Sequence, residues 1–436
     1  MAQKMTGARL FAQTLAAYGV SHVFFMDAVL RRALAEMEDC GITRILGHSE
    51  KAVAYMADGY ARVSGRPGVC FAQSVGAANL AAAMQDPYLG HSAVVAFTGR
   101  HVPAFQHRNA YQEVEHQPLF SAKAAMLEDH ALFRGAVGLY GRGCANHVVA
   151  DADLVIFAGS NTSDHTTANY KMPKQGTPIV QIDQDPVEIG RNYSNTVGLL
   201  ADVAAGMEAL ASACKPGQHG DWLGQTQKYV DEWRAEAEKA RSSAQMPMRP
   251  ERVCAELTEV LPRDAILVAD TGYAALWTGT LVYLRHPTQQ YIRAAGSLGW
   301  SFPAALGAKC AAPERPVICF CGDGGFFYHL PELETARRRG IKTVTIVNNN
   351  HGLSQGYRNL TTAYGEHDKS RMNECFEYRE TDFARVAQAF DCFGVTVDKP
   401  RDFRKAFEAA LASELPAVID VKTEFAAQAT LPWVPS

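Results

Sequence analysis

The sequence has little of what marks membrane, secreted or nucleic-acid-binding proteins. No stretch of its 436 residues reaches the roughly 18 consecutive apolar residues of a membrane-spanning helix. The amino-terminal segment carries charged and polar side chains where a secretory signal needs an uninterrupted apolar run. Lysine and arginine total 42 against 46 aspartate and glutamate, a net charge of −4, so no basic excess is available to neutralise phosphates. We predict a soluble, cytoplasmic protein without nucleic-acid or membrane partners.

Cysteine is too sparse for a disulfide scaffold. Ten cysteines are spread over the chain, and no two of them form a C-x-x-C pair. Cys319 and Cys321 lie two apart within a predicted strand, where we expect both to be reduced core residues. No internal repeat or low-complexity block stands out, so the sequence gives no sign of a repeat architecture.

Apolar runs of strand length alternate with helix-period segments at both ends of the chain. This alternation is typical of parallel sheets wound with crossover helices. Because single cores stop growing at roughly 250–300 residues, the chain is expected to form more than one domain. We predict an α/β protein with doubly wound parallel-sheet domains over residues 1–125 and 249–436, a shortened α/β domain over 126–210, and a solvated helix and linker over 211–248.

The expected strands are the short apolar runs. They are Val23–Phe25, Thr43–Leu46, Gly68–Ala72 and Ala93–Thr98 in the first domain, Leu154–Ala158 and Pro178–Ile182 in the middle, and Ala265–Ala269, Val317–Cys321, Thr343–Val347, Gly394–Val397 and Ala417–Val421 in the last.

The strongest local pattern joins two of these strands. The strand ending at Cys321 runs into Gly322-Asp323-Gly324-Gly325, and the strand ending at Val347 runs into Asn348-Asn349-Asn350-His351-Gly352. Parallel strands present such ends at one carboxyl edge, where ligands bind. Asp and Asn oxygens suit an octahedral Mg²⁺ that keeps places open for phosphate oxygens, and glycines let backbone N–H groups approach a diphosphate. The two segments together predict a site for Mg²⁺ and a diphosphate, whereas G-D-G alone would be an ordinary turn.

This pair of segments resembles the thiamine-diphosphate-binding signature of the acetolactate synthase and 2-oxo-acid decarboxylase superfamily, in which G-D-G precedes two asparagines by on the order of two dozen residues. Here 24 residues separate Gly324 from Asn349. The ungapped match implies that Asp323, Asn350 and the carbonyl of Gly352 are the Mg²⁺ ligands. The third asparagine leaves a one-residue ambiguity between Asn349 and Asn350. The resemblance also implies backbone contacts to the cofactor from Gly272, Gly322, Gly324 and Gly325.

A second matching stretch lies in the first domain. His48–Ala52 (HSEKA), followed by Ala57–Arg62 (ADGYAR), is similar to the H-E-x-x-A and A-D-G-Y-A-R segments of the family. The resemblance implies that Glu50 bonds to the pyrimidine ring of the cofactor, where a partly desolvated carboxyl can share a proton near neutral pH. An isolated glutamate at a helix start would only compensate the helix dipole.

Two more segments carry the resemblance towards the substrate. Ala295–Lys309 (AGSLGWSFPAALGAK) is similar to a family segment whose bulky apolar side chain wedges between the two cofactor rings, and Leu298 occupies that position. Taken alone, Leu298 would be core filler. Ala110–Glu115 (AYQEVE) resembles a segment of acetolactate synthase-like members whose glutamine faces the reacting centre, so Gln112 is the candidate there.

The sequence also departs from the family. Two loops that border the family's active cleft are replaced by Met26–Ala28 and Ser74–Asn79, which predicts a different substrate pocket. The paired histidines of pyruvate decarboxylases are missing, so no proton donor is assigned. Segments Ala152–Gly159 and Val180–Gly190 resemble the family's middle domain, but what normally precedes them is lacking. We therefore expect no FAD.

These resemblances imply a thiamine-diphosphate- and Mg²⁺-dependent lyase or transferase that acts on a carbon–carbon bond next to a carbonyl. The main hypothesis is decarboxylation of a 2-oxo acid, followed by protonation or by carboligation as in acetolactate synthase. Non-decarboxylating cleavage or acyloin ligation of a dione or hydroxyketone stays open, as does a catalytically silent binding or assembly subunit. In the family, the glutamate and the diphosphate site come from different subunits, which implies a homodimer or homotetramer with active sites between subunits.

Overall fold

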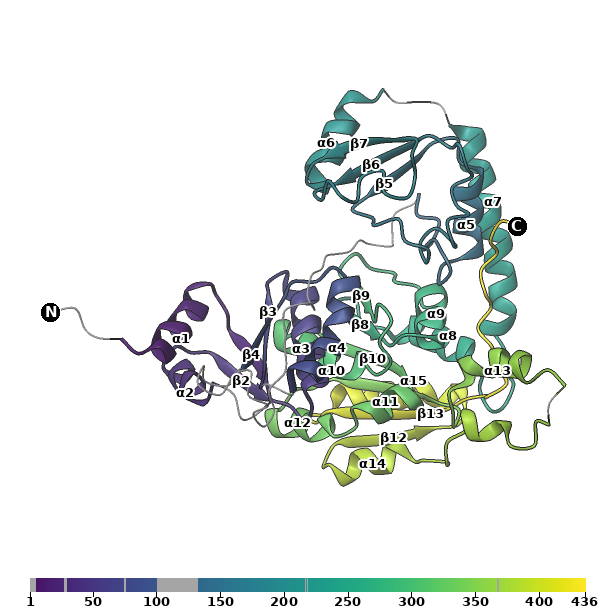
Figure 1. Ribbon diagram of the computed structural model, residues 1–436. Coiled ribbons are helices and arrows are strands. Elements are labelled where there is room, and N and C mark those ends of the chain that lie inside the picture. The colour runs from purple at the N-terminus through teal and green to yellow at the C-terminus, as the bar shows by residue number, and fades with distance from the viewer. Residues whose placement is uncertain are drawn as a thin grey trace. The chain divides into compact units, whose positions relative to one another are not determined.

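Three parallel sheets organise the chain (Figure 1). The computed structural model describes residues 5–26, 30–73, 76–99, 132–215, 217, 219–366 and 368–436. The chain divides into two units. Unit 1 consists of Met1–Ala124, Ala244–Ala275 and Arg285–Gln428, and unit 2 consists of Ala125–Ser243, Leu276–Leu284 and Ala429–Ser436.

The first sheet of unit 1 has the strand order β2-β1-β3-β4. Its strands are β1 (His22–Phe25), β2 (Thr43–Leu46), β3 (Gly68–Gln73) and β4 (Val94–Gly99), and its helices are α1 (Gly7–Ala17), α2 (Arg31–Asp39), α3 (Glu50–Ser64) and α4 (Gly76–Leu89). Strand β3 is buried at five of its six residues, which fits the near-continuous apolar run of a strand covered on both faces. Crossover helices therefore flank this sheet as the sequence pattern indicates.

The second sheet of unit 1 has six strands in the order β12-β13-β11-β10-β8-β9, all parallel. The strands are β8 (Ile266–Ala269), β9 (Gln290–Arg293), β10 (Val317–Gly322), β11 (Val344–Asn349), β12 (Phe393–Val397) and β13 (Ala417–Lys422). The helices are α8 (Pro250–Val260), α9 (Tyr273–Leu281), α10 (Ser301–Ala311), α11 (Asp323–Tyr328), α12 (Glu332–Arg339), α13 (Tyr357–Tyr364), α14 (Phe383–Ala389) and α15 (Pro400–Ala412). Strands β8, β10 and β11, in the interior of this sheet, are buried at every residue except Gly322.

Helices α3 and α10 join the two sheets of unit 1 at a very close crossing. A Cβ atom at Gly59 would overlap the carbonyl oxygen of Ala304, and one at Gly307 would overlap that of Met56. Only glycine lets two helix backbones approach this closely. One cluster of buried side chains runs through this crossing and continues into both sheets.

Unit 2 contains a smaller parallel sheet with the order β5-β6-β7. Its elements are β5 (Val155–Ala158), β6 (Ile179–Asp183), β7 (Thr196–Leu200), α5 (Gly143–Asp151), α6 (Val203–Ala213) and α7 (Gly220–Arg241). The carboxyl-terminal residues belong to this unit, where the Trp433 ring stacks on His147 at 3.6 Å and its carbonyl accepts from Asn146 Nδ2 at 2.8 Å.

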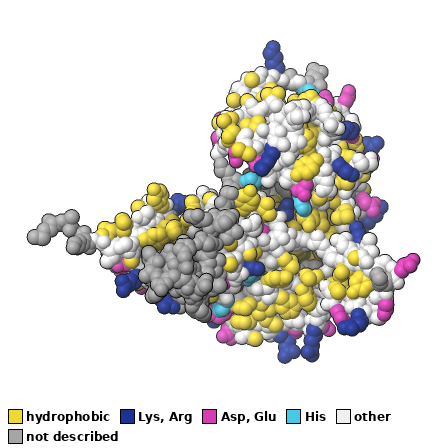
Figure 2. All heavy atoms as spheres, in the orientation of Figure 1, with side chains coloured by type: hydrophobic (Ala, Val, Ile, Leu, Met, Phe, Trp, Pro, Cys, Tyr) yellow, Lys and Arg dark blue, Asp and Glu magenta, His cyan; other side chains and the backbone are white. Residues whose placement is uncertain are grey.

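The α/β fold class predicted from the sequence is confirmed. Two strands were not expected, namely the edge strands β7 and β9. No helix in the described part of the chain has the length and apolar character to cross a bilayer. On the face drawn in Figure 2, the described lysine and arginine side chains are scattered among acidic ones and form no continuous basic stripe.

Candidate active site

The carboxyl ends of β10 and β11 bring a carboxylate and three carboxamides to one edge of the six-stranded sheet. The two strands pair in parallel with Gly322 opposite Asn348, so Asp323 follows directly at this edge. Asp323 is 2% exposed. Its Oδ1 accepts from Gly324 N–H at 2.7 Å, and its Oδ2 accepts from Gly352 N–H at 3.0 Å. Burial raises the pKa of Asp323 to about 6, although backbone donors oppose the shift.

The three asparagines at the end of β11 point to different surroundings. Asn349 donates from Nδ2 to the carbonyl of Thr381 and to Asp420 Oδ1, both at 2.9 Å. Asn350 donates to Ser354 Oγ at 3.0 Å. Because side chains alternate along a strand, Asn349 faces away from the side that Asn348 occupies. Its amide is therefore committed to the sheet interior.

Two buried polar atoms at this edge have no hydrogen-bond partner among the described residues. They are Asn348 Oδ1 and His351 Nδ1, which lie on either side of Asn349 and Asn350 in the sequence. Buried polar groups are nearly always paired, so orphaned atoms call for an explanation such as a missing ligand or water. The oxygens of Asp323 and Asn348 suit a hard divalent cation, and His351 Nδ1 could form a hydrogen bond with an oxygen-rich ligand. The described residues contain no group of three His, Cys, Asp or Glu side chains that could hold a metal by themselves.

The end of β8 packs beside these residues. Gly272 has φ +66°, a conformation that favours glycine, and a Cβ there would overlap Gln355 Oε1 in the segment after Gly352. A Cβ at Gly325 would lie 3.2 Å from Asp270 Cγ. The predicted cofactor-binding glycines therefore share one neighbourhood with Asp323.

Glu50 lies at the start of α3, where the Ser49 side chain caps the helix by accepting from Ala52 N–H at 3.1 Å. Glu50 Oε2 accepts from Asn79 Nδ2 at 2.8 Å. A Cβ at Gly76 would lie 2.5 Å from Glu50 Oε1, so any larger residue at this position would displace the carboxylate from where it lies. The first turns of α3 and α4 thus hold the Glu50 side chain between them.

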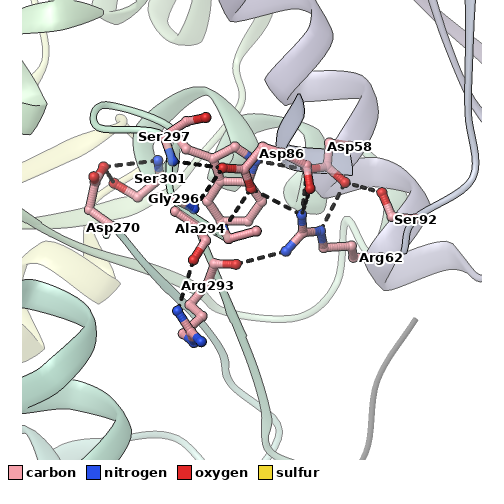
Figure 3. A network of polar contacts seen from close by, with 12 residues as sticks. Asp58, Arg62, Asp86, Ser92, Asp270, Arg293, Ala294, Gly296, Ser297 and Ser301 are labelled. Carbon is pink, nitrogen blue, oxygen red and sulfur yellow. Dashed lines mark hydrogen bonds and ion pairs between the residues drawn. The ribbon is translucent and has the colours of Figure 1, made fainter. Parts of the chain in front are cut away.

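Leu298 sits in a segment that two buried carboxylates hold by its backbone (Figure 3). The Asp86 carboxylate accepts from the backbone N–H groups of the three residues that precede Leu298. Asp270 accepts from Gly299 N–H at 3.0 Å and from Ser301 N–H at 3.1 Å. Leu298 itself is half-buried.

Comparison with known proteins gives three consecutive matches along the chain. Residues 5–119 match the family model of the N-terminal thiamine pyrophosphate (thiamine diphosphate) binding domain of thiamine pyrophosphate enzymes. Residues 117–210 match the model of their central domain, and residues 270–421 match that of their C-terminal binding domain. The chain belongs to the thiamine-diphosphate enzymes of the acetolactate synthase superfamily.

The relatives of this thiamine-diphosphate enzyme are distant. A putative thiamine pyrophosphate-containing protein, YdaP of Bacillus subtilis, is 29% identical over 69% of this chain and 50% of its own length. The acetolactate synthase large subunit of Lactococcus lactis is 27% identical over 70% of this chain and 52% of its own. The probable acetolactate synthase large subunit of Methanocaldococcus jannaschii is 23% identical over 99% of this chain and 94% of its own.

The matched region spans about half the length of most of these relatives. The alignment with the Methanocaldococcus protein runs over 564 positions, so at least 128 of them (564 − 436) have no residue in this enzyme. The chain is therefore considerably shorter than that relative.

The structure brings the expected site residues together in two groups. Asp323, Asn350 and Gly352 lie at one sheet edge, with Gly272 beside them. Glu50 lies on α3, and no hydrogen bond or ion pair among the described residues joins it to Leu298 or to the first group. Gln112 lies outside the described residues.

The sequence motifs assign no role to two polar residues at the site. Asn79, which bonds Glu50, belongs to a loop whose sequence departs from that of the family. Asp86 was missed, although a lone aspartate in the apolar helix α4 is an unusual residue that must find partners when buried. The backbone N–H groups that donate to Asp86 lie more than 200 residues away, beyond the reach of local pattern reading.

Proposed function

We propose that this enzyme uses thiamine diphosphate and Mg²⁺ to cleave or form a carbon–carbon bond next to a carbonyl, by decarboxylating a 2-oxo acid and then protonating the product or joining it to a second carbonyl. The observation that carries the proposal is the buried Asp323 carboxylate at the sheet edge that also holds Asn348 Oδ1 and His351 Nδ1, two buried atoms with no hydrogen-bond partner in the described part of the chain. These groups lie within the region that matches the C-terminal thiamine pyrophosphate binding domain.

Asp323, Asn350 and the carbonyl of Gly352 would hold the Mg²⁺. The commitment of the Asn349 amide to Asp420 and Thr381 favours Asn350 over Asn349 as the metal ligand. Main-chain groups of the four glycines at this edge would face the diphosphate, namely Gly272, Gly322, Gly324 and Gly325. Asp323 must be ionised to bind the cation, and a nearby cation would lower a pKa that burial has raised.

The bound cofactor would supply an electron sink that allows CO₂ to leave from the carbon next to a carbonyl. Glu50 would hold a proton at the pyrimidine ring, and Asn79 would keep the Glu50 carboxylate oriented through its hydrogen bond. Leu298 would fix the angle between the two cofactor rings. Gln112 is proposed to face the substrate.

A second copy of the chain would complete the site. No hydrogen bond or ion pair within the described part of one chain joins Glu50 to Leu298, Asp323 or Asn350, which agrees with a glutamate that serves a cofactor held by another subunit. We therefore propose a homodimer or homotetramer. Sedimentation of the active enzyme would test this, and a fully active monomer would contradict it.

The direct test is a panel of small 2-oxo acids supplied to the protein with Mg²⁺ and thiamine diphosphate, with CO₂ release as the readout. Release that depends on both additions supports the proposal. Diacetyl is tested in a parallel assay. If the enzyme forms acetate or an acyloin from diacetyl but releases no CO₂ from the 2-oxo acids, its reaction is cleavage or ligation of a dione and not decarboxylation.

Glu50→Gln separates chemistry from binding. Without a titratable carboxyl the pyrimidine proton cannot be held, so turnover should fall at least about a hundredfold. Calorimetric affinity for the Mg²⁺ cofactor should stay within a few-fold of wild type. Unchanged turnover in this variant would remove Glu50 from the mechanism.

A further inference from the structure

Asp86 makes an unusual set of contacts for a carboxylate inside a helix. It is fully buried in α4, yet its two oxygens accept from three consecutive backbone N–H groups of one distant segment (Figure 3). The distances are 2.8 Å from Ala295, 3.2 Å from Gly296 and 2.9 Å from Ser297. These are the three residues that lead directly into Leu298.

The other side of Leu298 is held in the same way from a different sheet. Asp270, at the end of β8, accepts from Gly299 N–H at 3.0 Å and from Ser301 N–H and Oγ at 3.1 and 2.6 Å. A Cβ at Gly299 would lie 2.7 Å from Tyr328 Cβ, so the end of α11 also closes on this segment. The residues directly before and after Leu298 are therefore both anchored by a buried carboxylate.

The Asp86 carboxylate is itself fixed by a buried ion-pair network. Arg62 donates to Asp86 Oδ1 at 3.2 Å and to Asp58 Oδ2 at 2.7 Å, and its Nη1 donates to the carbonyl of Arg293 at 2.7 Å. Trp300 Nε1 donates to Asp58 Oδ2 at 2.8 Å. Burial acts to lower the pKa of Arg62, but Asp58 and Asp86 together raise it, so the guanidinium stays charged. Ala295 and Trp300, on either side of Leu298, thus both connect to one charged cluster.

Helix α4 also carries Asn79, the residue that bonds Glu50. Asp86 lies seven positions after Asn79, a distance of about 10 Å along a helix axis. The same rigid element therefore orients the Glu50 carboxylate at one end and the backbone before Leu298 at the other.

From these contacts we infer that Asp86 is a positioning residue that fixes the backbone carrying Leu298, so that the Leu298 side chain is preorganised before the cofactor arrives. This inference rests on the proposed function, in which Leu298 touches the cofactor rings. An ion pair between Asp86 and Arg62 would stabilise the fold without three further bonds from Asp86 to the successive amides that precede Leu298. Preorganisation of this kind lowers the barrier of the reaction rather than adding affinity.

Amide hydrogen exchange of the cofactor-free protein tests the anchor directly. Asp86→Asn replaces an acceptor by an amide that cannot accept all three bonds, so exchange at Ala295, Gly296 and Ser297 should accelerate at least about tenfold. The amides of Gly299 and Ser301, which bond Asp270, should change much less. Single-residue resolution can come from fragmentation mass spectrometry.

Kinetics test the consequence. In Asp86→Asn, kcat should fall roughly tenfold to a hundredfold, because small misplacements of positioning groups cost that much. The dissociation constant of the Mg²⁺ cofactor should rise no more than about threefold. The rate at which the thiazolium C2 proton exchanges with D₂O, followed by acid quench and NMR, should fall in step with kcat.

The matched control is Phe403→Leu, a buried substitution on α15 where Phe403 stacks on Phe407. It should lower the melting temperature without releasing the amides at 295–297 or slowing C2 exchange. If Asp86→Asn does not fold, Asp86→Glu keeps the charge for Arg62, shifts the carboxylate by one methylene and should release the same amides.

Unchanged exchange at 295–297 would overturn the anchor, and released amides with unchanged kcat would overturn the positioning role. If the wild-type protein takes up no thiamine diphosphate, the proposed function fails and the positioning role with it. Released amides in Asp86→Asn would still establish the anchor in that case, so the two failures are distinguishable.

Discussion

The sheets of unit 1 and unit 2 are built from the same kind of parallel ladder but are covered very differently. All six residues of β11 in unit 1 are buried. In β7 of unit 2, four of five residues are exposed, and Val197 and Leu200 are 66% and 63% exposed. Every described residue that we assign to cofactor or metal binding lies in unit 1. The comparison teaches that deep burial accompanies the edge where chemistry is proposed, because a covered sheet holds its strand ends rigidly.

The largest expected effect is at that edge. Asp323→Asn removes the only carboxylate among the proposed metal ligands, so turnover should fall at least about a thousandfold. Calorimetry should show weakened uptake of the Mg²⁺ cofactor. The exposed Asp398→Asn serves as the matched control and should leave both measurements unchanged. Full activity of Asp323→Asn would move the metal site elsewhere.

A smaller but still large effect is expected where α3 crosses α10. Gly59→Ala places a methyl group onto the carbonyl oxygen of Ala304, so the two helices must separate. We expect a loss of about 3 kcal/mol in the free energy of unfolding, at the upper end for overpacking. Urea denaturation gives this value, and a variant as stable as wild type would show that the crossing can relax.

The acid side of the stability profile should respond to one buried histidine. Burial lowers the pKa of His329 to about 4 in the folded state, and its Nε2 has no partner among the described residues. Below about pH 6.5 the unfolded chain takes up a proton that the folded protein refuses, so stability falls as the pH drops from 6.5 towards 4. The loss should be on the order of 2 kcal/mol at pH 4.5.

Denaturation at pH 7 and pH 4.5 checks this expectation. His329→Gln should reduce the difference between the two values, whereas His219→Gln, at an exposed position of unit 2, should leave it unchanged. An unaltered difference in His329→Gln would assign the acid sensitivity to other groups.

The smallest expected effect is a change in stability caused by a substitution in unit 2. Gly224 lies within α7, and a Cβ there would meet nothing within 4 Å. Gly224→Ala should therefore stabilise by about 0.5–1 kcal/mol, the helix preference of alanine over glycine. Gly59→Ala is expected to lower the free energy of unfolding and Gly224→Ala to raise it, and this difference follows only from what surrounds each glycine. A destabilised Gly224→Ala would show that unit 2 is packed more tightly there than the structure indicates.

Local patterns predicted most of the fold, because buried parallel strands are continuous apolar runs. Strands β10 and β11 and the polar residues at their ends are the best example. The edge strand β7 was missed since it is short, exposed and interrupted by Gly198, and β9 (QYIR) was missed since half of its residues are polar.

In the candidate site, too, some residues could be predicted from local sequence patterns and others could not. Asp323 and Glu50 could be predicted from the sequence, because one follows a strand and the other begins a helix. The role of Asp86 could not be read locally, because it depends on backbone groups 211 residues away in the case of Ser297. A backbone N–H group carries no sequence signal, so only the folded chain reveals which amides a buried carboxylate serves.

The contact between α3 and α10 constrains how a substrate could reach this site. A main-chain oxygen lies where the Cβ atom of Gly59 would be, and another lies where that of Gly307 would be, so at these two positions α3 and α10 touch backbone to backbone. Rotation of one helix against the other would disturb both of these close main-chain contacts. We therefore expect any opening for substrate and product to occur away from this crossing, which would keep its geometry while other segments move.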